Sequence, residues 1–134
     1  MKRNIILIVD DDLDDREIIR DAFLSTAYNT PEFIFLENGD SLIQYFSANN
    51  IVPNLIMLDL NMPGKDGREA LKEIKNDPHL NIIPVIVFTT SSSKRDRDTS
   101  YSLGANCFVT KPDTFNKLVD LANCISKLWL PEAV

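Results

Sequence analysis

The stretch of sequence that decides the fold is Asn54-Leu-Ile-Met-Leu-Asp59-Leu-Asn-Met-Pro-Gly-Lys-Asp-Gly67. Its apolar run, residues 55–58, is typical of a strand that is buried on both faces at the centre of a parallel sheet. The residues that follow include Pro63, Gly64 and Gly67, which favour turns. Asp59 therefore falls at the carboxyl end of a central strand, where open α/β sheets bind their ligands. Because a strand-end aspartate can also simply cap the next turn, its role depends on which other residues reach the same edge.

The composition is that of an ordinary globular chain, with 134 residues, 44% hydrophobic and 25% charged. This length suits one core, so we expect a single domain over residues 1–134. The net charge of −6 argues against nucleic-acid binding, which needs a basic patch. No apolar run approaches the roughly 20 residues of a membrane helix, and the first apolar run is too short for a signal peptide. We therefore expect a cytoplasmic protein that binds neither nucleic acid nor a membrane.

Two cysteines and one histidine are the candidate ligands for a soft metal. Cys107 and Cys124 are too few for a disulfide framework and lack metal-ligand spacing, so we expect both to be small core residues of a reduced protein. His79 follows Pro78 in a predicted loop, and we expect it to be neither a ligand nor a phosphate relay.

Apolar runs and helical patterns alternate five times along the chain. We expect strands at residues 5–9, 33–36, 55–58, 82–88 and 107–110. Such alternation predicts an α/β fold, a doubly wound five-stranded parallel sheet with helices on both faces. The apolar stripes of the first three helices and the arc of the last are, in order, Ile18, Ile19, Ala22 and Phe23; Leu42, Ile43 and Phe46; Ala70, Leu71 and Ile74; and Leu118, Leu121, Ala122, Ile125, Leu128 and Trp129.

The ends of these helices are marked by capping residues. Asp40 or Ser41 is the expected N-cap of the second helix, and Gly104 suits the end of a polar helix over residues 94–103. In the last helix, residues 113–129, Val119 falls off the apolar arc and Trp129 lies at the end. A homodimer or partner contact through this helix and the neighbouring surface is therefore a hypothesis.

Several polar residues are predicted to meet at the carboxyl edge of the sheet. Carboxylates a few ångströms apart repel one another, and Mg²⁺, which takes few hard oxygen ligands and keeps room for water and phosphate, would relieve that repulsion. A lysine would add positive charge, and a threonine hydroxyl could hydrogen-bond a phosphoryl oxygen. The combination indicates phosphoryl transfer to Asp59. The residues that the strand ends bring to this edge are Asp10, Asp11, Asp12, Asp59, Thr89 and Lys111.

At these positions the chain resembles the receiver domain of two-component response regulators. The resemblance spans essentially the whole chain and implies the strand order 2-1-3-4-5. Each motif is short, but four in order at strand ends are specific. The motifs that carry it are Val9-Asp-Asp11, Leu58-Asp59-Leu-Asn-Met-Pro63 with Asp66-Gly67, Phe88-Thr89, and Thr110-Lys111-Pro112.

The resemblance implies an acceptor and a metal site. Asp59 matches the aspartate that receives the phosphoryl group. Asp11 matches the direct ligand of Mg²⁺, Asp10 matches its neighbour that acts through water, and Asn61 matches the position whose backbone carbonyl binds the metal. With Ser91, two residues beyond Thr89, Asn61 also matches the positions that help set the lifetime of the phosphoryl group.

The resemblance also implies a switch. Thr89 matches the hydroxyl that moves toward the acyl phosphate, and Lys111 matches the lysine that pairs with phosphoryl oxygens. The bond before Pro112 is expected to be cis, as in the family. Phe108 occupies the aromatic switch position, where many members have tyrosine, so its ring can rotate inward but offers no hydroxyl.

Further short motifs are similar to stand-alone regulators that are paired with phytochrome-type photoreceptor kinases. They are Asn76-Asp-Pro78, Ile83-Pro84, Phe88-Thr89-Thr-Ser, Asn106-Cys107-Phe-Val-Thr-Lys111 and Trp129-Leu130. The likeness implies a sensor histidine kinase as phosphoryl donor, no output domain, and a switch between two conformations that is read by an unknown downstream protein. It implies no enzymatic activity beyond Mg²⁺-dependent phosphorylation and dephosphorylation of the chain itself.

Three alternatives fit the residues less well. A phosphatase of the haloacid dehalogenase type needs an acid two residues after its nucleophile, where this chain has Asn61. A nucleotide-binding protein would need a G-x-G-x-x-G or P-loop motif, and neither is present. An EF-hand is excluded because residues 10–15 lack the required glycine and glutamate spacing.

Two charged segments are assigned to solvent-facing parts of helices. In the run of residues 10–15, we assign Asp12, Asp14 and Asp15 to the start of a helix, whose dipole favours acids. We interpret residues 94–98 as a solvated helix face near the partner surface.

Overall fold

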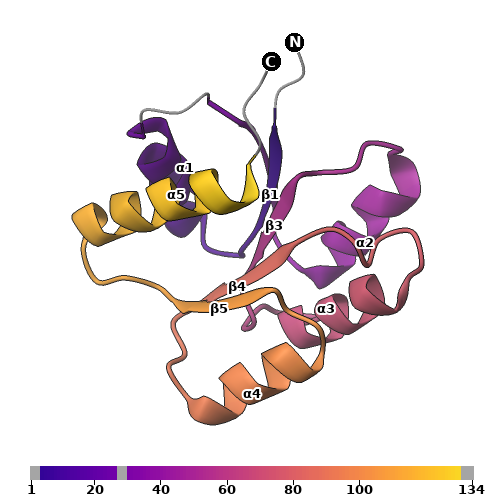
Figure 1. Ribbon diagram of the computed structural model, residues 1–134. Helices are drawn as coiled ribbons and strands as arrows, with labels where there is room; N and C mark the ends of the chain where they lie inside the picture. Colours follow the sequence, from indigo (N-terminus) through magenta and orange to yellow (C-terminus); the bar gives the residue numbers. More distant parts are fainter. Residues whose placement is uncertain (1–3, 27–29, 131–134) are drawn as a thin grey trace.

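The computed structural model describes residues 4–26 and 30–130. Five parallel strands form one sheet in the order β2-β1-β3-β4-β5 (Figure 1). The strands are β1 (Ile5–Val9), β2 (Glu32–Leu36), β3 (Leu55–Leu58), β4 (Val85–Thr89) and β5 (Cys107–Thr110). The helices are α1 (Leu13–Leu24), α2 (Gly39–Ala48), α3 (Gly67–Asn76), α4 (Lys94–Ser102) and α5 (Phe115–Trp129). The predicted α/β fold and its strand order 2-1-3-4-5 are confirmed.

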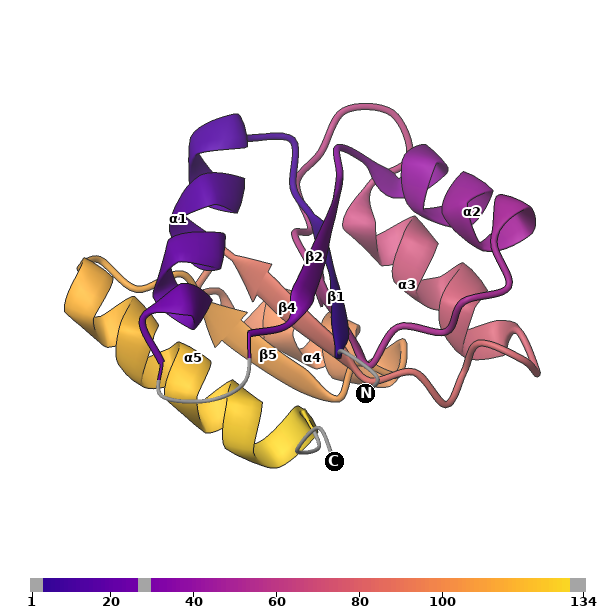
Figure 2. The same cartoon turned by 90° about the horizontal axis from the view of Figure 1, so that it is seen from above.

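The helices form two layers on the sheet. Helices α1 and α5 lie side by side on one face, and α2, α3 and α4 lie on the other (Figure 2). Along β1 and β3 the side chains alternate between the two layers: Leu7 and Leu58 pack in the core under α2 and α3, whereas Ile8 and Met57 pack in the core under α1 and α5. The apolar runs of the sequence follow from this arrangement, because a strand covered on both faces needs apolar side chains on both.

The helix ends agree in part with the sequence. Gly104 has a φ of +105° just after α4, as expected of a residue that ends a helix. The predicted N-cap of α2 is wrong, because the cap is Asn38, whose Oδ1 accepts a hydrogen bond from the backbone N–H of Ser41 at 2.8 Å. Asp40 lies instead in the first turn, where its charge suits the helix dipole.

Strand β4 begins three residues later than predicted. Ile82 is 76% exposed, whereas Ile83 is 1% exposed. The two residues lie in a turn after α3, in which the N–H of Ile83 donates to the carbonyl of Leu80 at 3.0 Å. Pro84 has no N–H to donate to a central ladder, so the strand starts only after it.

Burial corrects several other predictions. Cys124 is exposed on α5 and Cys107 is partly buried, so the expectation that both are core residues is wrong for Cys124. Leu128 is exposed, whereas Val119 packs against the core under α1 and α5. Helical spacing does not show how far the neighbouring helix covers each position. Ile18, on the predicted stripe of α1, is also exposed for this reason.

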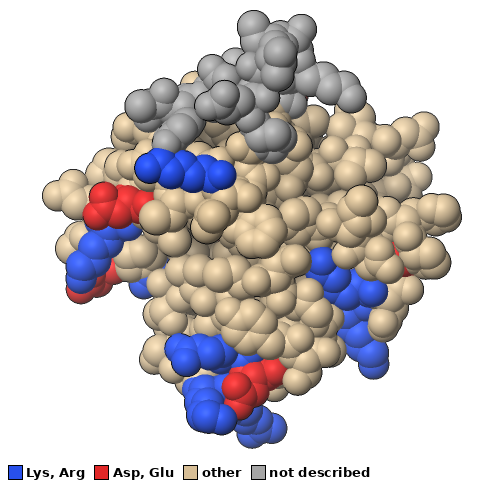
Figure 3. Space-filling model, viewed as in Figure 1, with Lys and Arg blue, Asp and Glu red and all other residues tan. Residues whose placement is uncertain are grey.

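The surface of α4 carries charges of both signs. Basic side chains gather over α4 in Figure 3 with acidic ones among them. Lys94 pairs with Asp98 at 2.8 Å, both well exposed, as expected of a solvated helix face. Over the described parts of the chain, no helix has the length and apolar character needed to span a membrane.

Candidate functional site

The candidate site lies where β1 and β3 end side by side. The register pairs Val9 with Leu58, so the next residues, Asp10 and Asp59, leave the sheet together. The N–H of Asp59 donates to the carbonyl of Val9 at 3.0 Å, which fixes the two turns against each other. Asp10 is 2% exposed and Asp59 is 8% exposed, whereas Asp11 faces solvent.

Three carboxylates converge at this point. Asp10, Asp11 and Asp59 each offer an oxygen, and these oxygens all lie within 4.8 Å of one another. Burial raises the pKa of the Asp10 carboxyl above its ordinary value, although hydrogen bonds from Lys111 and from the backbone of Asp12 act in the opposite direction. Ionised carboxylates this close need a cation between or beside them.

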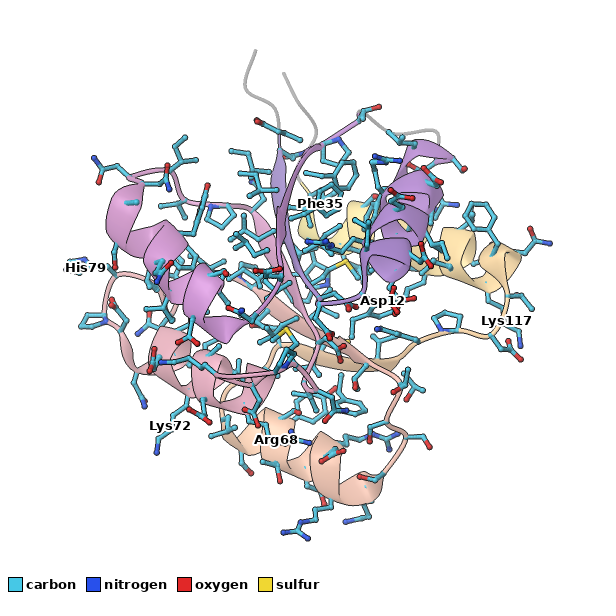
Figure 4. The ribbon with its side chains drawn as sticks, turned by 180° about the vertical axis from the view of Figure 1, so that it is seen from behind. Asp12, Phe35, Arg68, Lys72, His79 and Lys117 are labelled. Carbon is cyan, nitrogen blue, oxygen red and sulfur yellow. The ribbon has the colours of Figure 1, made fainter. Side chains whose placement is uncertain are left out.

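Local hydrogen bonds orient the carboxylates. Oδ1 of Asp10 accepts from the N–H of Asp12 at 2.9 Å, and Oδ1 of Asp59 accepts from the N–H of Asn61 at 3.4 Å. Asp12 in turn caps α1 by accepting from the N–H groups of Asp14 and Asp15 (Figure 4). The turns after β1 and β3 are therefore held by Oδ1 of their own aspartates, and Oδ2 of Asp10 and of Asp59 remains for contacts with other parts of the chain.

Lys111, just after β5, supplies a positive charge. Its Nζ lies 2.8 Å from Asp10 Oδ2, 2.8 Å from Asp15 Oδ2 and 3.5 Å from Asp59 Oδ2. Burial alone lowers the pKa of Lys111, but the hydrogen bonds to Asp10 and Asp15 and the charge of Asp59 outweigh it and raise the pKa well above its ordinary value. Lys111 therefore stays protonated and positively charged at neutral pH.

The donor set fits a divalent cation. Three carboxylates, one of them exposed, are the hard oxygen ligands that Mg²⁺ and similar cations take while they keep several waters. Lys111 brings one positive charge to this edge, where Asp10, Asp11, Asp15 and Asp59 bring four carboxylates. The site therefore stays negative without a metal ion, and a cation would find both ligands and charge there.

The predicted switch residues lie on the two neighbouring strands. Thr89 ends β4 and is buried, and its Oγ1 accepts from the N–H of Ser91 at 3.4 Å. Phe108 on β5 is buried in the core under α2 and α3, so its ring is in the inward position, and the Arg97 guanidinium lies 5.8 Å from the ring centroid. The N–H of Phe108 donates to the hydroxyl of Tyr101 on α4 at 3.1 Å. Phe108 is thus linked to α4 rather than to the carboxylates.

One implied feature is corrected. The bond between Lys111 and Pro112 is trans, as are all peptide bonds within the described residues. The trans form is the one that X–Pro bonds ordinarily favour, by about 0.5–1 kcal/mol.

Two features of the site were missed from the sequence. Asp15 was assigned only to the helix dipole, yet it binds Lys111; its place in the first turn of a helix that starts beside Asp10 was the available indication. The loop after Thr89 is also fastened, because Asp96 accepts from Ser91 Oγ at 2.6 Å and from Arg68 at 2.8 Å. Arg68 reaches from α3 to α4 (Figure 4), a contact between distant segments that no local pattern marks.

Comparison with known proteins places this site in a family. The family profile described as the response regulator receiver domain matches residues 6–123. The response regulator Rcp1 of Synechocystis sp. (strain ATCC 27184 / PCC 6803 / Kazusa) is 39% identical over 131 residues, which cover 94% of this chain and 88% of that protein. The chain belongs to the response regulator receiver domain family, and it is a receiver of the two-component type, as predicted.

Solved structures give the same result. The phosphorylated cyanobacterial phytochrome response regulator RcpA superposes with a TM-score of 0.89 at 36% identity, covering 99% of this chain and 98% of that one. The Mn(2+)-bound form of response regulator Rcp1 superposes with a TM-score of 0.85 at 36% identity, covering 98% and 97%. The predicted likeness to stand-alone, phytochrome-associated regulators is therefore confirmed.

Proposed function

We propose that this receiver accepts one phosphoryl group on Asp59 from the phosphohistidine of a sensor histidine kinase. The observation that carries the proposal is the position of Asp59, which is nearly buried at the mouth of the sheet with Asp10 and Asp11 carboxylates within 4.8 Å and the Lys111 ammonium at 3.5 Å. A carboxylate among groups that can neutralise phosphoryl oxygens is suited to nucleophilic attack on phosphorus.

A divalent cation belongs to this proposal. Asp10, Asp11, Asp59 and the backbone carbonyl of Asn61 would hold Mg²⁺, and the Mn²⁺-bound form of the relative Rcp1 supports a divalent metal in this family. When bound, the cation would neutralise charge on the carboxylates and on the incoming phosphoryl oxygens. The exposed Asp11 would keep the site open to solvent and to the donor.

The chain's own residues then carry the transfer. A carboxylate oxygen of Asp59 forms the new bond to phosphorus as the phosphorus–nitrogen bond of the donor histidine breaks, and the donor nitrogen leaves with the electron pair. Lys111 neutralises the phosphoryl oxygens, and the hydroxyl of Thr89 donates a hydrogen bond to one of them. Water later cleaves the acyl phosphate to inorganic phosphate and free Asp59. In this proposal the chain catalyses only its own phosphorylation and dephosphorylation and acts on no other substrate.

The output is a shift between two conformations. Movement of Thr89 toward the phosphoryl group would pull the loop that leads into α4, and Phe108, packed beside α4, would respond by changing its packing. A downstream protein would read the changed surface. The chain covers 88% of Rcp1 and 98% of RcpA, which supports residues 1–134 acting in this switch as one receiver domain.

The proposed donor is a phytochrome-type histidine kinase in the cytoplasm. It is supported by the likeness to RcpA, whose structure is described as that of a phytochrome response regulator. Cys124 and Leu128 are both exposed and lie four residues apart on one face of α5, which supports the predicted homodimer through this helix and the neighbouring surface. Sedimentation that shows only monomer, with and without phosphorylation, would contradict the dimer.

Intact-mass measurement tests the proposal. The protein is incubated with a small phosphodonor, with and without Mg²⁺, as wild type and as Asp59→Asn. We expect one added phosphoryl group on wild type with Mg²⁺ and none on the variant. An equal adduct on Asp59→Asn would refute Asp59 as acceptor, and an adduct formed equally well in chelator would refute the metal requirement.

A further inference from the structure

Asp15 is a carboxylate at the site to which the proposed function gives no role. It lies in the first turn of α1, 96 residues before Lys111 in the chain, yet its Oδ2 accepts a hydrogen bond from Lys111 Nζ at 2.8 Å. The distance from the same Nζ to Asp59 Oδ2 is longer, 3.5 Å. The ammonium is therefore held by Asp15 and Asp10 at full hydrogen-bond strength and touches the acceptor only loosely.

Nζ has close neighbours on some sides and open space on another. It also lies 6.0 Å from the centroid of the ring of Phe88, the last residue but one of β4. The side chains of Asp15, Lys111 and Phe88 line a small cavity of about 110 Å³ that opens between α1 and the turn after β5. Lys111 therefore has room on the Asp15 side of the site.

A phosphoryl group on Asp59 would compete for this ammonium. An ammonium has three N–H donors, and two are already used. The phosphoryl group brings about −1.5 to −2 charges and three strong acceptor oxygens, so Lys111 should turn toward it. Only the third N–H is left for the phosphoryl oxygens, so pairing with more than one of them would take a donor that Asp10 or Asp15 now holds.

Burial decides which partner yields. The Asp10 side chain is 3% exposed and would lose its ammonium with no water to replace it. The Asp15 side chain is 36% exposed, so water can take the place of Lys111 there at little cost.

We propose that Asp15 is a positioning residue that holds Lys111 back from Asp59 in the unphosphorylated receiver and releases it when the phosphoryl group arrives. The inference rests on the proposed function, in which Lys111 pairs with the phosphoryl oxygens. Because the Asp15–Lys111 pair exists only in the unphosphorylated state, it opposes phosphorylation by the free energy of that pair. Removing Asp15 should therefore favour the phosphorylated state.

The test is the affinity of the full chain for beryllofluoride, an analogue of the phosphoryl group, measured by calorimetry at saturating Mg²⁺. We expect Asp15→Asn to bind roughly 2- to 10-fold more tightly than wild type, the range for a partly exposed charged hydrogen bond. Asp15→Glu, which restores a carboxylate, should return the affinity toward that of wild type. Asp15→Ser repeats the neutral change should Asp15→Asn fold poorly.

Asp14→Asn is the matched control. Asp14 is exposed in the same helical turn, carries the same charge, and is not among the carboxylates that bind Lys111 in the described structure. Its affinity should stay close to wild type. Equal tightening in Asp14→Asn and Asp15→Asn would show a general charge effect and overturn the inference, as would equal or weaker binding by Asp15→Asn. A wild type that binds no beryllofluoride would instead refute the proposed function, and this inference with it.

Discussion

Gly67 joins the turn that carries Asp59 to α3 so closely that a single methyl group should disturb both. It is the first residue of α3, and its N–H donates to the carbonyl of Leu60 at 3.0 Å. An ideal Cβ on Gly67 would lie 2.1 Å from the backbone oxygen of Asp59 and 2.8 Å from Cα of Leu60. Both neighbours are backbone atoms and cannot rotate away, so Gly67→Ala must push α3 from the turn.

The expected cost can be worked from these contacts. Inserting a carbon into a packed region costs about 1–3 kcal/mol, and weakening the hydrogen bond between Gly67 and Leu60 adds about 1 kcal/mol. We expect Gly67→Ala to lower the free energy of unfolding by about 3 kcal/mol. Gly64→Ala is the matched control from the same loop, because its nearest neighbour would be Asp40 Oδ2 at 3.4 Å and it suffers only from its φ of +74°, at about 1–2 kcal/mol.

Urea unfolding of the two variants and wild type measures these costs. Gly67→Ala should also take up a phosphoryl group more slowly, since the displaced backbone carries Asp59. The reasoning is refuted if Gly67→Ala is as stable as wild type, or if it loses less stability than Gly64→Ala.

Three further predictions concern the loop, the strand start and the metal. Hydrogen bonds, chiefly from Ser91, hold the pKa of Asp96 below its ordinary 3.8, so its carboxylate stabilises the fold above that pH and less as the pH falls below it. Asp96→Asn should therefore melt below wild type at neutral pH, with the difference shrinking in acid. Ile82→Ser should change the unfolding free energy by under about 0.5 kcal/mol and Ile83→Ser lower it by about 3 kcal/mol, because only Ile83 is buried. Mg²⁺ should raise the melting temperature by binding the folded state, and less in Asp11→Asn.

A specific result would contradict each of these three predictions. If the difference in melting temperature between Asp96→Asn and wild type does not change with pH, the charge of the Asp96 carboxylate does not stabilise the loop. Equal losses at Ile82 and Ile83 would place the start of β4 earlier than Val85. If differential scanning fluorimetry shows that Mg²⁺ stabilises wild type and Asp11→Asn equally, Asp11 is not a ligand of the metal ion.

The sheet and the centre of the site could be predicted from the sequence because both follow from local pattern and topology. A strand covered on both faces must be apolar throughout, so residues 55–58 marked the centre of a parallel sheet. Parallel strands end on one edge, and a polar residue directly after such a strand must lie there. Asp10, Asp59 and Lys111 were placed together by that reasoning, and the structure brings them within ion-pair distance.

Other features were decided only by tertiary packing. The exposure of Ile82 and Cys124 depends on how far neighbouring segments extend over them, which spacing along the chain does not encode. The contacts of Asp15 with Lys111 and of Arg68 with Asp96 join segments 96 and 28 residues apart. The local sequence around a charged side chain in a helical turn does not show whether that side chain faces water or a distant lysine. Its partner is chosen by the geometry with which the helices pack on the sheet, and that geometry is a property of the whole fold.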